Sequence, residues 1–113
     1  MDFQAEELAE IFSIFSNAKR LQIFWSLDGN EKSVNEIAQA IESSMQNTSQ
    51  HLRLMKAHNI LESRRHRQSI YYRIAESEVA NFCRILQPQN YKSFLEVMAK
   101  SSDDTVYEQQ EEF

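Results

Sequence analysis

The sequence predicts a mainly α-helical fold with one small β-hairpin, and three observations lead to this prediction. The chain of 113 residues contains one Gly and one Pro, so residue type forces few turns. Apolar residues recur at helical spacing within residues 33–58. Two β-prone runs follow, at 60–65 and 69–74, and a short polar turn separates them. With 42% apolar residues, we expect one domain with a modest core.

The first helix of the central stretch is predicted to begin after Ser33. Ser33 and Glu36 have the spacing of a capping box, in which each side chain accepts a hydrogen bond from a backbone N–H at the helix start. Apolar residues then follow at i, i+3, i+4 and i+7: Val34, Ile37, Ala38 and Ile41. The polar residues 42–44 interrupt this pattern, which predicts a tight turn.

A second helix is predicted to start with Ser43 or Ser44 as its N-cap and to run through His58. Its inward stripe comprises Thr48, Leu52 and Met55. Its outer face carries amides, hydroxyls and cations: Gln46, Asn47, Ser49, Gln50, Arg53 and Lys56. Amides pair with adenine edges, and hydroxyls and cations contact bases or phosphates, so this face suits a DNA major groove. An ordinary solvated helix face has similar residue types, and that alternative stays open on composition alone.

The hairpin favours the DNA-binding interpretation. Its turn and flanks carry four arginines beside Gln68: Arg64, Arg65, Arg67 and Arg73. A structural hairpin rarely needs so many cations at one end. A basic wing that follows a recognition helix does need them, because phosphate contacts supply most of the non-specific affinity for DNA. The stretch from 33 to 74 therefore predicts a winged helix-turn-helix.

The charge distribution agrees with this prediction although the net charge is −5. Residues 43–73 contain six Lys or Arg and one acidic residue, a local net charge of +5. The rest of the chain carries −10. Because local potential steers a polyanion more than total charge does, we expect nucleic acid to approach the second helix and the wing.

Further amphipathic helices are predicted on both sides of the central stretch. At the N-terminus, apolar residues at helical spacing indicate a helix from roughly Phe3 to Phe15. Asn17 is placed to cap the next helix, which residues 28–30 end. After the hairpin, residues 79–86 form another apolar helix pattern. Pro88 removes a backbone donor and clashes with the preceding turn, so we expect a break near it and then a last helix.

Several segments, taken in order, resemble the ArsR-type (arsenic-repressor-like) winged-helix regulators. The segments that carry the resemblance are Asn17–Ile23, Val34–Ile41, Thr48–Lys56, Asn59–Arg65 and Ile70–Ile74. The resemblance implies a homodimeric bacterial or archaeal transcription factor, usually a repressor that a metal, an oxidant or another signal releases from DNA. Glu42 stands where this family usually has Gly, and Ser43 stands where it has an apolar residue. Because Gly reaches positive φ without strain, we expect a turn of different shape here.

The resemblance also implies that the terminal helices form the dimer contact. The expected interface residues are Leu8, Ile11, Phe12, Phe15, Phe82, Cys83, Leu86 and Phe94. Packing of the N-terminal helix against its own domain is the alternative. An isologous dimer would place two recognition helices ~34 Å apart, facing a palindromic operator.

Signal sites of this family need clustered cysteines, or paired Asp, His or Glu on the last helix. The chain has one cysteine, and Pro88 and Gln89 stand where the second ligand pair would fall. A transition-metal site takes about four N, S or O ligands, so we expect neither a classical metal site nor a cofactor. Cys83 has two interpretations. It is a small buried apolar residue, or it lies near the dimer axis and bonds its symmetry mate on oxidation.

These observations predict a sequence-specific regulator that binds double-stranded DNA, acts as a homodimeric repressor and is not an enzyme. Glycine-rich phosphate loops and catalytic residue pairs are missing from the sequence. A winged-helix module for protein–protein contact and a thiol-based redox sensor using Cys83 are the alternatives. Apolar runs stay short of the ~20 residues of a membrane span, and no secretory signal is evident, so we expect a cytoplasmic protein. The predicted domain covers residues 1–100, and 101–113 form an acidic, disordered tail.

Overall fold

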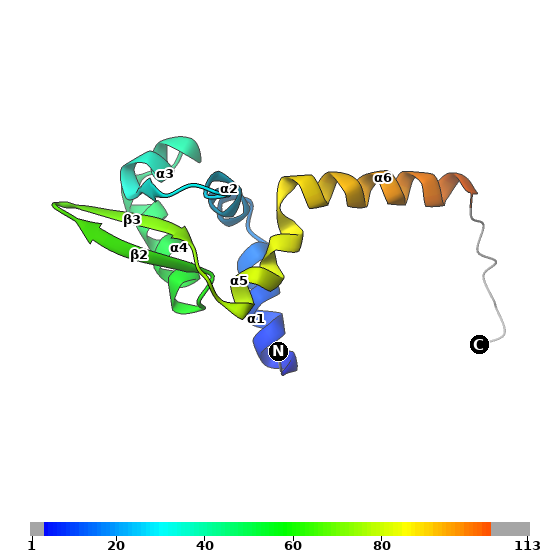
Figure 1. Cartoon of the computed structure of the whole chain (residues 1–113), viewed down its shortest axis with the longest axis horizontal. Coiled ribbons are helices and arrows are strands. Elements are labelled where there is room, and N and C mark those ends of the chain that lie inside the picture. Colours follow the sequence, from blue (N-terminus) through cyan, green and yellow to red (C-terminus); the bar gives the residue numbers. More distant parts are fainter. Residues whose placement is uncertain (1–3, 105–113) are drawn as a thin grey trace.

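The computed structural model describes residues 4–104 and confirms a mainly helical fold with a small antiparallel sheet (Figure 1). Its elements are α1 (Ala5–Phe15), α2 (Ala18–Ser26), β1 (Lys32–Ser33), α3 (Val34–Ala40), α4 (Met45–Ala57), β2 (Leu61–His66), β3 (Ser69–Ile74), α5 (Glu78–Cys83), the 3-10 helix η1 (Arg84–Leu86) and α6 (Pro88–Asp104). Phe3, the predicted start of the first helix, lies outside the described residues. Helices α3 and α4 with strands β2 and β3 form the predicted winged helix-turn-helix.

The sheet has the order β1-β3-β2, and both pairs of strands are antiparallel. The predicted hairpin is confirmed, with Leu61 opposite Ile74 at its base and His66 opposite Ser69 at its tip. Strand β1 was not predicted. It contains two residues, which show no periodicity, and only the non-local pairing with β3 makes them a strand.

The helix-turn-helix begins with the predicted capping box. The backbone N–H of Ser33 donates to Glu36 Oε1 at 2.8 Å, and the N–H of Glu36 donates to Ser33 Oγ at 3.2 Å. At the start of α4, Ser44 Oγ accepts from the N–H of Asn47 at 3.0 Å, so Ser44 rather than Ser43 is the N-cap. These side-chain acceptors satisfy backbone donors that helix geometry leaves unpaired.

We expected Glu42 to give the turn between α3 and α4 a different shape from the Gly-containing turn of the family. The structure shows the Gly-type turn instead. Glu42 adopts φ +53°, in the left-handed region that Gly favours. Its N–H donates to the carbonyl of Gln39 at 3.2 Å, and the N–H of Ser43 donates to that of Ala38 at 3.0 Å. This is the Schellman arrangement of a helix C-terminus. The ammonium of Lys19 also donates to the carbonyls of Ile41 and Glu42, so the turn keeps its shape with a strained residue in place.

The core lies where the helices meet the sheet. The predicted inward stripe of α4 is confirmed, since Thr48, Leu52 and Met55 are fully buried. Leu52 and Met55 pack within a cluster that also contains Phe24 of α2 and Ile37 of α3. The face of α4 opposite this stripe is therefore held toward solvent.

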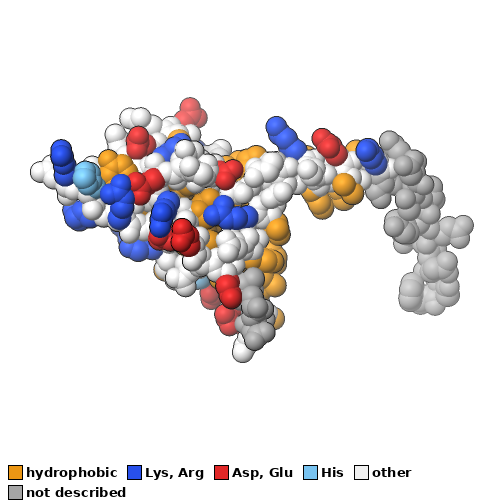
Figure 2. All heavy atoms as spheres, viewed as in Figure 1, with side chains coloured by type: hydrophobic (Ala, Val, Ile, Leu, Met, Phe, Trp, Pro, Cys, Tyr) orange, Lys and Arg blue, Asp and Glu red, His pale blue; other side chains and the backbone are white. Residues whose placement is uncertain are grey.

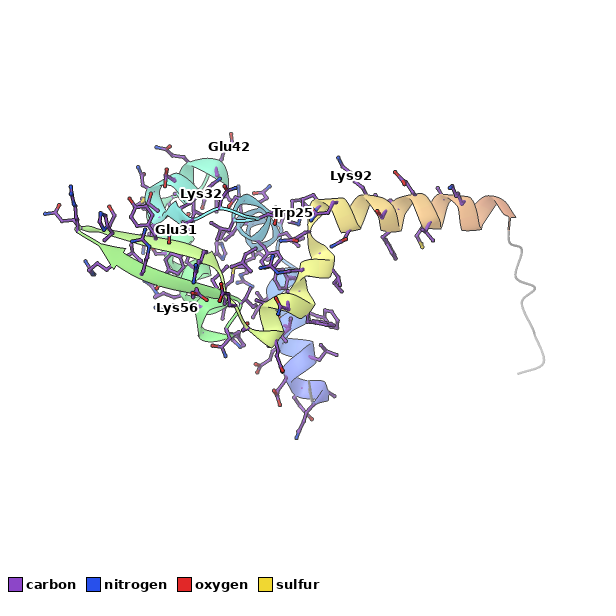
Figure 3. The ribbon with its side chains drawn as sticks, viewed as in Figure 1. Trp25, Glu31, Lys32, Glu42, Lys56 and Lys92 are labelled. Atoms are coloured by element: carbon purple, nitrogen blue, oxygen red, sulfur yellow. The ribbon has the colours of Figure 1, made fainter. Side chains whose placement is uncertain are left out.

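The predicted break near Pro88 is confirmed, and it redirects the chain. Gln87 is extended, with φ −70° and ψ 153°, and Pro88 is the first residue of α6. Proline suits this position because its fixed φ is helical and its missing N–H would have no partner there. Trp25, labelled in Figure 3, donates through Nε1 to the carbonyl of Leu86 at 2.6 Å. Gln87 Nε2 donates to Asp28 Oδ1 at 2.9 Å. The end of α2 thereby holds the start of α6.

Helix α6 projects away from the rest of the described chain (Figure 1). It exposes a row of large apolar side chains: Phe94, Leu95, Val97 and Met98. The helix runs on to Asp104, past the predicted domain boundary after residue 100. The remainder of the predicted tail, residues 105–113, lies outside the described residues.

Replacing Glu42 with Gly is expected to stabilise the fold. The substitution relieves a left-handed residue, and we expect the free energy of unfolding to rise by about 0.5–1 kcal/mol after the greater backbone entropy of Gly is subtracted. Urea denaturation measures this change. Gln39→Gly, inside α3, is the matched control and should destabilise the protein, because its backbone is helical. A loss of stability in Glu42→Gly would contradict the strain argument.

Candidate nucleic-acid interface

Helix α4 presents a polar surface to solvent. Gln46, Asn47, Gln50, Arg53 and Lys56 are exposed, and Ser49 is partly buried. Their amide, hydroxyl and cationic groups lie on the side opposite the buried stripe, as the periodicity predicts. The face is continuous along the helix and holds one exposed large apolar residue, Met45, at its first turn.

Two histidines tie α4 to the neighbouring helices. His51 Nδ1 accepts from Arg20 Nε of α2 at 3.2 Å. Burial and the nearby Arg20 cation lower the pKa of His51, which favours the neutral ring that this acceptor role requires. His58 Nε2 lies 3.1 Å from Glu10 Oε2 of α1, and its Nδ1 lies 3.1 Å from the carbonyl of Leu54. Both histidines therefore fix the orientation of α4 and do not face the predicted DNA surface.

The wing has two different faces, because successive side chains of a strand point in opposite directions. Leu61 and Ser63 face the helices, since Leu61 is buried and Ser63 Oγ accepts from Lys56 Nζ of α4 at 2.7 Å. By the same alternation Arg65 belongs to the face that α4 borders. Glu62 and Arg64 belong to the outer face of the sheet.

Arginines on the outer face are paired with acids. Arg64 donates to Glu31 through Nε at 2.8 Å and Nη2 at 2.6 Å, and its Cζ lies 5.2 Å from the Tyr71 ring centroid. Arg73 donates to Glu62 Oε2 through Nε at 2.9 Å and Nη2 at 2.7 Å. The hydrogen bond from Arg64 lowers the pKa of Glu31, and it raises the pKa of Arg64 in return. Two of the four wing cations are therefore already neutralised within the protein.

Arginines at the tip of the wing are free by contrast. Among the described residues, the side chains of Arg65 and Arg67 have no hydrogen-bond or ion-pair partner. Arg67 begins the turn with φ +58°, and Gln68 follows it. Both arginines and Gln68 are exposed. Figure 2 shows Lys and Arg side chains gathered over this end of the wing.

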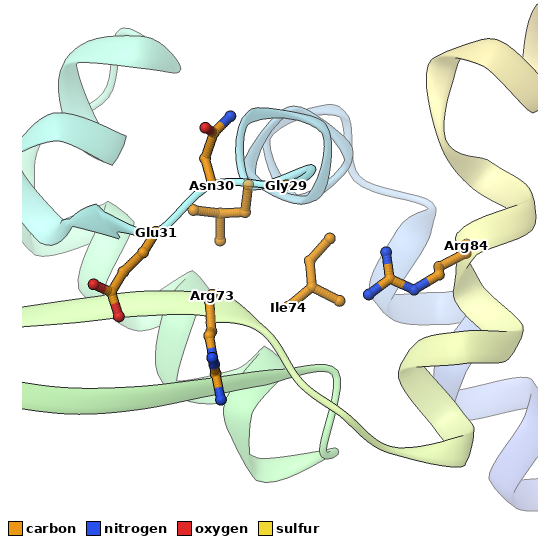
Figure 4. A pocket seen from close by; sticks show the side chains of 7 residues that line it. Gly29, Asn30, Glu31, Arg73, Ile74 and Arg84 are labelled. Carbon is orange, nitrogen blue, oxygen red and sulfur yellow. The ribbon is translucent and has the colours of Figure 1, made fainter.

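The tip of the wing and the start of α4 border a shared hollow of about 290 Å³. Its lining residues are Ser33, Val34, Asn35, Met45, Ser49, Gln68, Ser69 and Ile70. The structure therefore brings together Ser49 and Gln68, which are far apart in the sequence. A second hollow, of about 350 Å³, lies at the base of the wing and includes Arg73 and Arg84 (Figure 4). Its lining comes from the α2–β1 loop, the end of β3 and η1, and includes no residue of α4.

Expected dimer residues fall into two groups. Ile11, Phe15 and Cys83 are buried inside this chain, so they form its own core and offer no surface to a partner. Phe12 and Phe94 are 50% and 59% exposed. Leu8, Phe82 and Leu86 are partly exposed, and the rings of Phe12 and Phe82 lie 6.4 Å apart. Helical periodicity in the sequence could not tell the buried residues from the exposed ones. The apolar stripe of α1 is wide, and Ile11 and Phe15 meet the core whereas Phe12 does not.

Cys83 is 1% exposed, and its burial raises the pKa of the thiol to about 11. A thiol is a poor nucleophile, since the thiolate is the reactive form. This position suits the interpretation of Cys83 as a core residue and does not suit a disulfide to a symmetry mate.

Among the side chains that the structure describes, no three of His, Cys, Asp or Glu lie close enough together to hold a metal ion. Over the same part of the chain, no helix combines the length and the apolar character needed to cross a membrane.

Comparison with known proteins agrees with this geometry. Residues 15–64 match a family model described as a helix-turn-helix domain. The HTH-type transcriptional regulator KmtR of Mycobacterium tuberculosis is 33% identical over 78 residues, which are 69% of this chain and 60% of KmtR. The chain therefore spans about three fifths of the length of that relative. The biofilm growth-associated repressor of Xylella fastidiosa is 31% identical over 86 residues, which are 76% of this chain and 75% of the repressor.

A solved structure extends the similarity to the whole described fold. It is the solution NMR structure of the homodimeric winged helix-turn-helix DNA-binding domain Mb0332 from Mycobacterium bovis, described as a possible ArsR-family transcriptional regulator. It superimposes with a TM-score of 0.63 at 25% identity and covers 97% of this chain and all of that fragment.

The fold and the exposed basic surface define a winged helix-turn-helix of the DNA-binding class. The chain belongs to the ArsR-type family of transcriptional regulators. The relatives named above are regulators and a repressor rather than enzymes.

Cys83 is expected to resist thiol reagents while the protein is folded. With a pKa of about 11, about one thiol in a thousand is ionised at pH 8. Burial also keeps the reagent away from the sulfur atom. Iodoacetamide should therefore modify the native protein much more slowly than the urea-unfolded protein, with a rate that rises between pH 9 and 11. Mass spectrometry measures this single cysteine directly. Equal rates in the two states at pH 8 would revive the redox-sensor interpretation.

Proposed function

We propose that this protein is a homodimeric transcriptional repressor that binds a palindromic operator in double-stranded DNA and uses no classical metal-sensing site. One observation carries the proposal. The polar face of α4 and the tip of the wing border the same hollow, through Ser49 of α4 and Gln68, which follows the exposed Arg67 in the turn. A duplex with α4 in its major groove would meet the wing at the adjacent groove or backbone. Such a regulator acts in the cytoplasm.

The proposed contacts divide by chemistry. Gln46, Asn47, Ser49 and Gln50 read base edges from the first turns of α4, because amides and hydroxyls both donate and accept hydrogen bonds. Arg53, Lys56, Arg65, Arg67 and Gln68 hold phosphates or enter the minor groove. Arg64 was expected among the phosphate ligands, but its two hydrogen bonds to Glu31 engage it within the protein. Lys56 keeps further donors for phosphate while it contacts Ser63.

The proposed dimer uses α1 and α6. The apolar residues of α6 and Phe12 of α1 are exposed in the single chain. A hollow of about 610 Å³ with a largely apolar lining lies where η1 meets α6, between Ile85, Leu86, Asn90 and Phe94. Covering such surface removes apolar area from water, which favours association. The homodimeric state of the Mb0332 structure supports this part of the proposal.

The protein–protein alternative has less support. A docking surface for another protein would carry exposed apolar side chains on α4 and the wing. Among the described residues of these elements, Met45 is the exposed large apolar side chain. The surface carries cations and amides instead, which suit a polyanion.

Selection of bound DNA tests the proposal as a whole. Purified protein is mixed with random genomic fragments at two salt concentrations, with reductant and with oxidant, and retained fragments are sequenced. We expect a palindrome with half-sites one helical turn apart, retained less well at high salt and equally under both redox conditions. A single half-site would contradict the dimer, and no enrichment would contradict sequence-specific binding.

Gln50→Ala is expected to weaken operator binding by about 1–3 kcal/mol, the discrimination supplied by a bidentate amide–adenine pair. Binding to random DNA should stay unchanged. Fluorescence anisotropy with both duplexes measures the two affinities. An equal loss on both would remove Gln50 from base readout.

Arg67→Ala is the matched control for Gln50→Ala. We expect it to weaken binding to every duplex and to reduce the slope of log K against log salt by about 0.9, because one phosphate contact is lost. An unchanged slope would remove Arg67 from the phosphate ligands.

A further inference from the structure

The outer face of the wing holds an ion pair that spans the sheet. Arg64 of β2 donates two hydrogen bonds to Glu31, the residue before β1. Strand β3 lies between β1 and β2, so the contact reaches from one edge of the sheet to the other. Tyr71 of β3 lies below it, with the Arg64 Cζ 5.2 Å from the ring centroid. Strands β2 and β3 and the residue before β1 thereby meet at one guanidinium.

Glu31 is directly joined to the helix-turn-helix. Strand β1 consists of Lys32 and Ser33, and Ser33 is also the N-cap of α3. Two residues therefore separate Glu31 from the start of α3, which packs against α4. The wing and the recognition helix are thus connected through β1 as well as through the short link between α4 and β2.

Strand β1 is too short to hold the wing by backbone pairing. It pairs with β3 at two positions, Lys32 with Tyr72 and Ser33 with Tyr71. So few ladder contacts are marginal in water. The planar guanidinium of Arg64 adds a bidentate contact of defined direction, which a Lys ammonium would not reproduce.

We propose that the Glu31–Arg64 pair positions the wing relative to α4, and that Arg64 supports DNA binding through this placement rather than as a phosphate ligand. The inference rests on the proposed function of the same surface. It separates two kinds of wing cation. The side chains of Arg65 and Arg67 have no partner among the described residues, whereas Arg64, like Arg73, has its Nε and Nη2 engaged by a carboxylate. A phosphate at Arg64 would have to displace that carboxylate.

Variants of the Glu31–Arg64 pair distinguish a positioning role of Arg64 from a role as a phosphate ligand. The set is Glu31→Gln, Arg64→Ala, Arg64→Lys and the double variant Glu31→Gln/Arg64→Ala, with Arg67→Ala as the phosphate comparator and Lys92→Ala as a remote control. Lys92 is exposed on α6, far from the wing (Figure 3). Operator affinity is measured for each protein at several salt concentrations.

We expect Glu31→Gln and Arg64→Ala each to weaken binding about two- to fivefold, the factor that an exposed ion pair supplies. The double variant should bind no worse than either single variant, the salt slope should stay at the wild-type value, and Arg64→Lys should not restore affinity. The result with Glu31→Gln is diagnostic. Removing a negative charge beside DNA should strengthen binding by electrostatics alone, so weaker binding indicates lost positioning.

Tighter binding by Glu31→Gln would overturn the proposal and make Glu31 a competitor of phosphate for Arg64. A salt slope reduced in Arg64→Ala as in Arg67→Ala, with affinity restored in Arg64→Lys, would also overturn it.

A second measurement applies even when the wild type binds no DNA, an outcome that refutes the proposed function separately. Hydrogen exchange of the amides paired between β1 and β3 should be faster in Glu31→Gln and Arg64→Ala than in wild type, Arg67→Ala or Lys92→Ala. Unchanged exchange in both variants would show that the pair does not hold β1, and would overturn the proposal.

Discussion

Burial of the inner stripe of α4 is the constraint on which the rest of the structure depends. Thr48, Leu52 and Met55 have no exposed surface, and Leu52 and Met55 pack with residues of α2, α3 and the sheet. A helix buried along one stripe can rotate little without exposing apolar area to water. The polar face of α4 is consequently presented in one orientation. The hydrogen bond between Arg20 and His51 reinforces that orientation from α2.

Helices α3 and α4 each end in a residue with left-handed backbone conformation. Glu42 ends α3 with φ +53°, and Asn59 ends α4 with φ +62°. At Asn59 the N–H of Ile60 donates to the carbonyl of Met55 at 3.0 Å, and both of these side chains are buried. Asn tolerates this conformation better than Glu does. The chain thus turns sharply into the wing at low cost, whereas the turn into α4 carries some strain.

Whether a wing arginine is available to bind DNA depends on the direction of its side chain rather than on its position in the sequence. The arginines of the wing share a short segment, yet alternate residues of β2 face opposite sides of the sheet. Arg64 meets a carboxylate from a loop more than thirty positions away, while the tip arginines meet solvent. Counting cations in the segment 43–73 overestimates the charge available to DNA, because Glu31 lies outside that segment.

Local patterns in the sequence were sufficient to predict the helices, the caps at Ser33 and Asn17, the hairpin and the break near Pro88. The helices and caps depend on neighbours within about four residues, through hydrogen bonds and helical spacing, and the hairpin depends on two adjacent β-prone runs joined by a short turn. Tertiary packing decided the pairing of β1, the burial of Ile11, Phe15 and Cys83, and the engagement of Arg64 by Glu31. These features join residues that are distant in the chain, and local spacing carries no information about such contacts. The sequence therefore predicted which residue types form the candidate surface, and the packed structure decided which of them are free to bind.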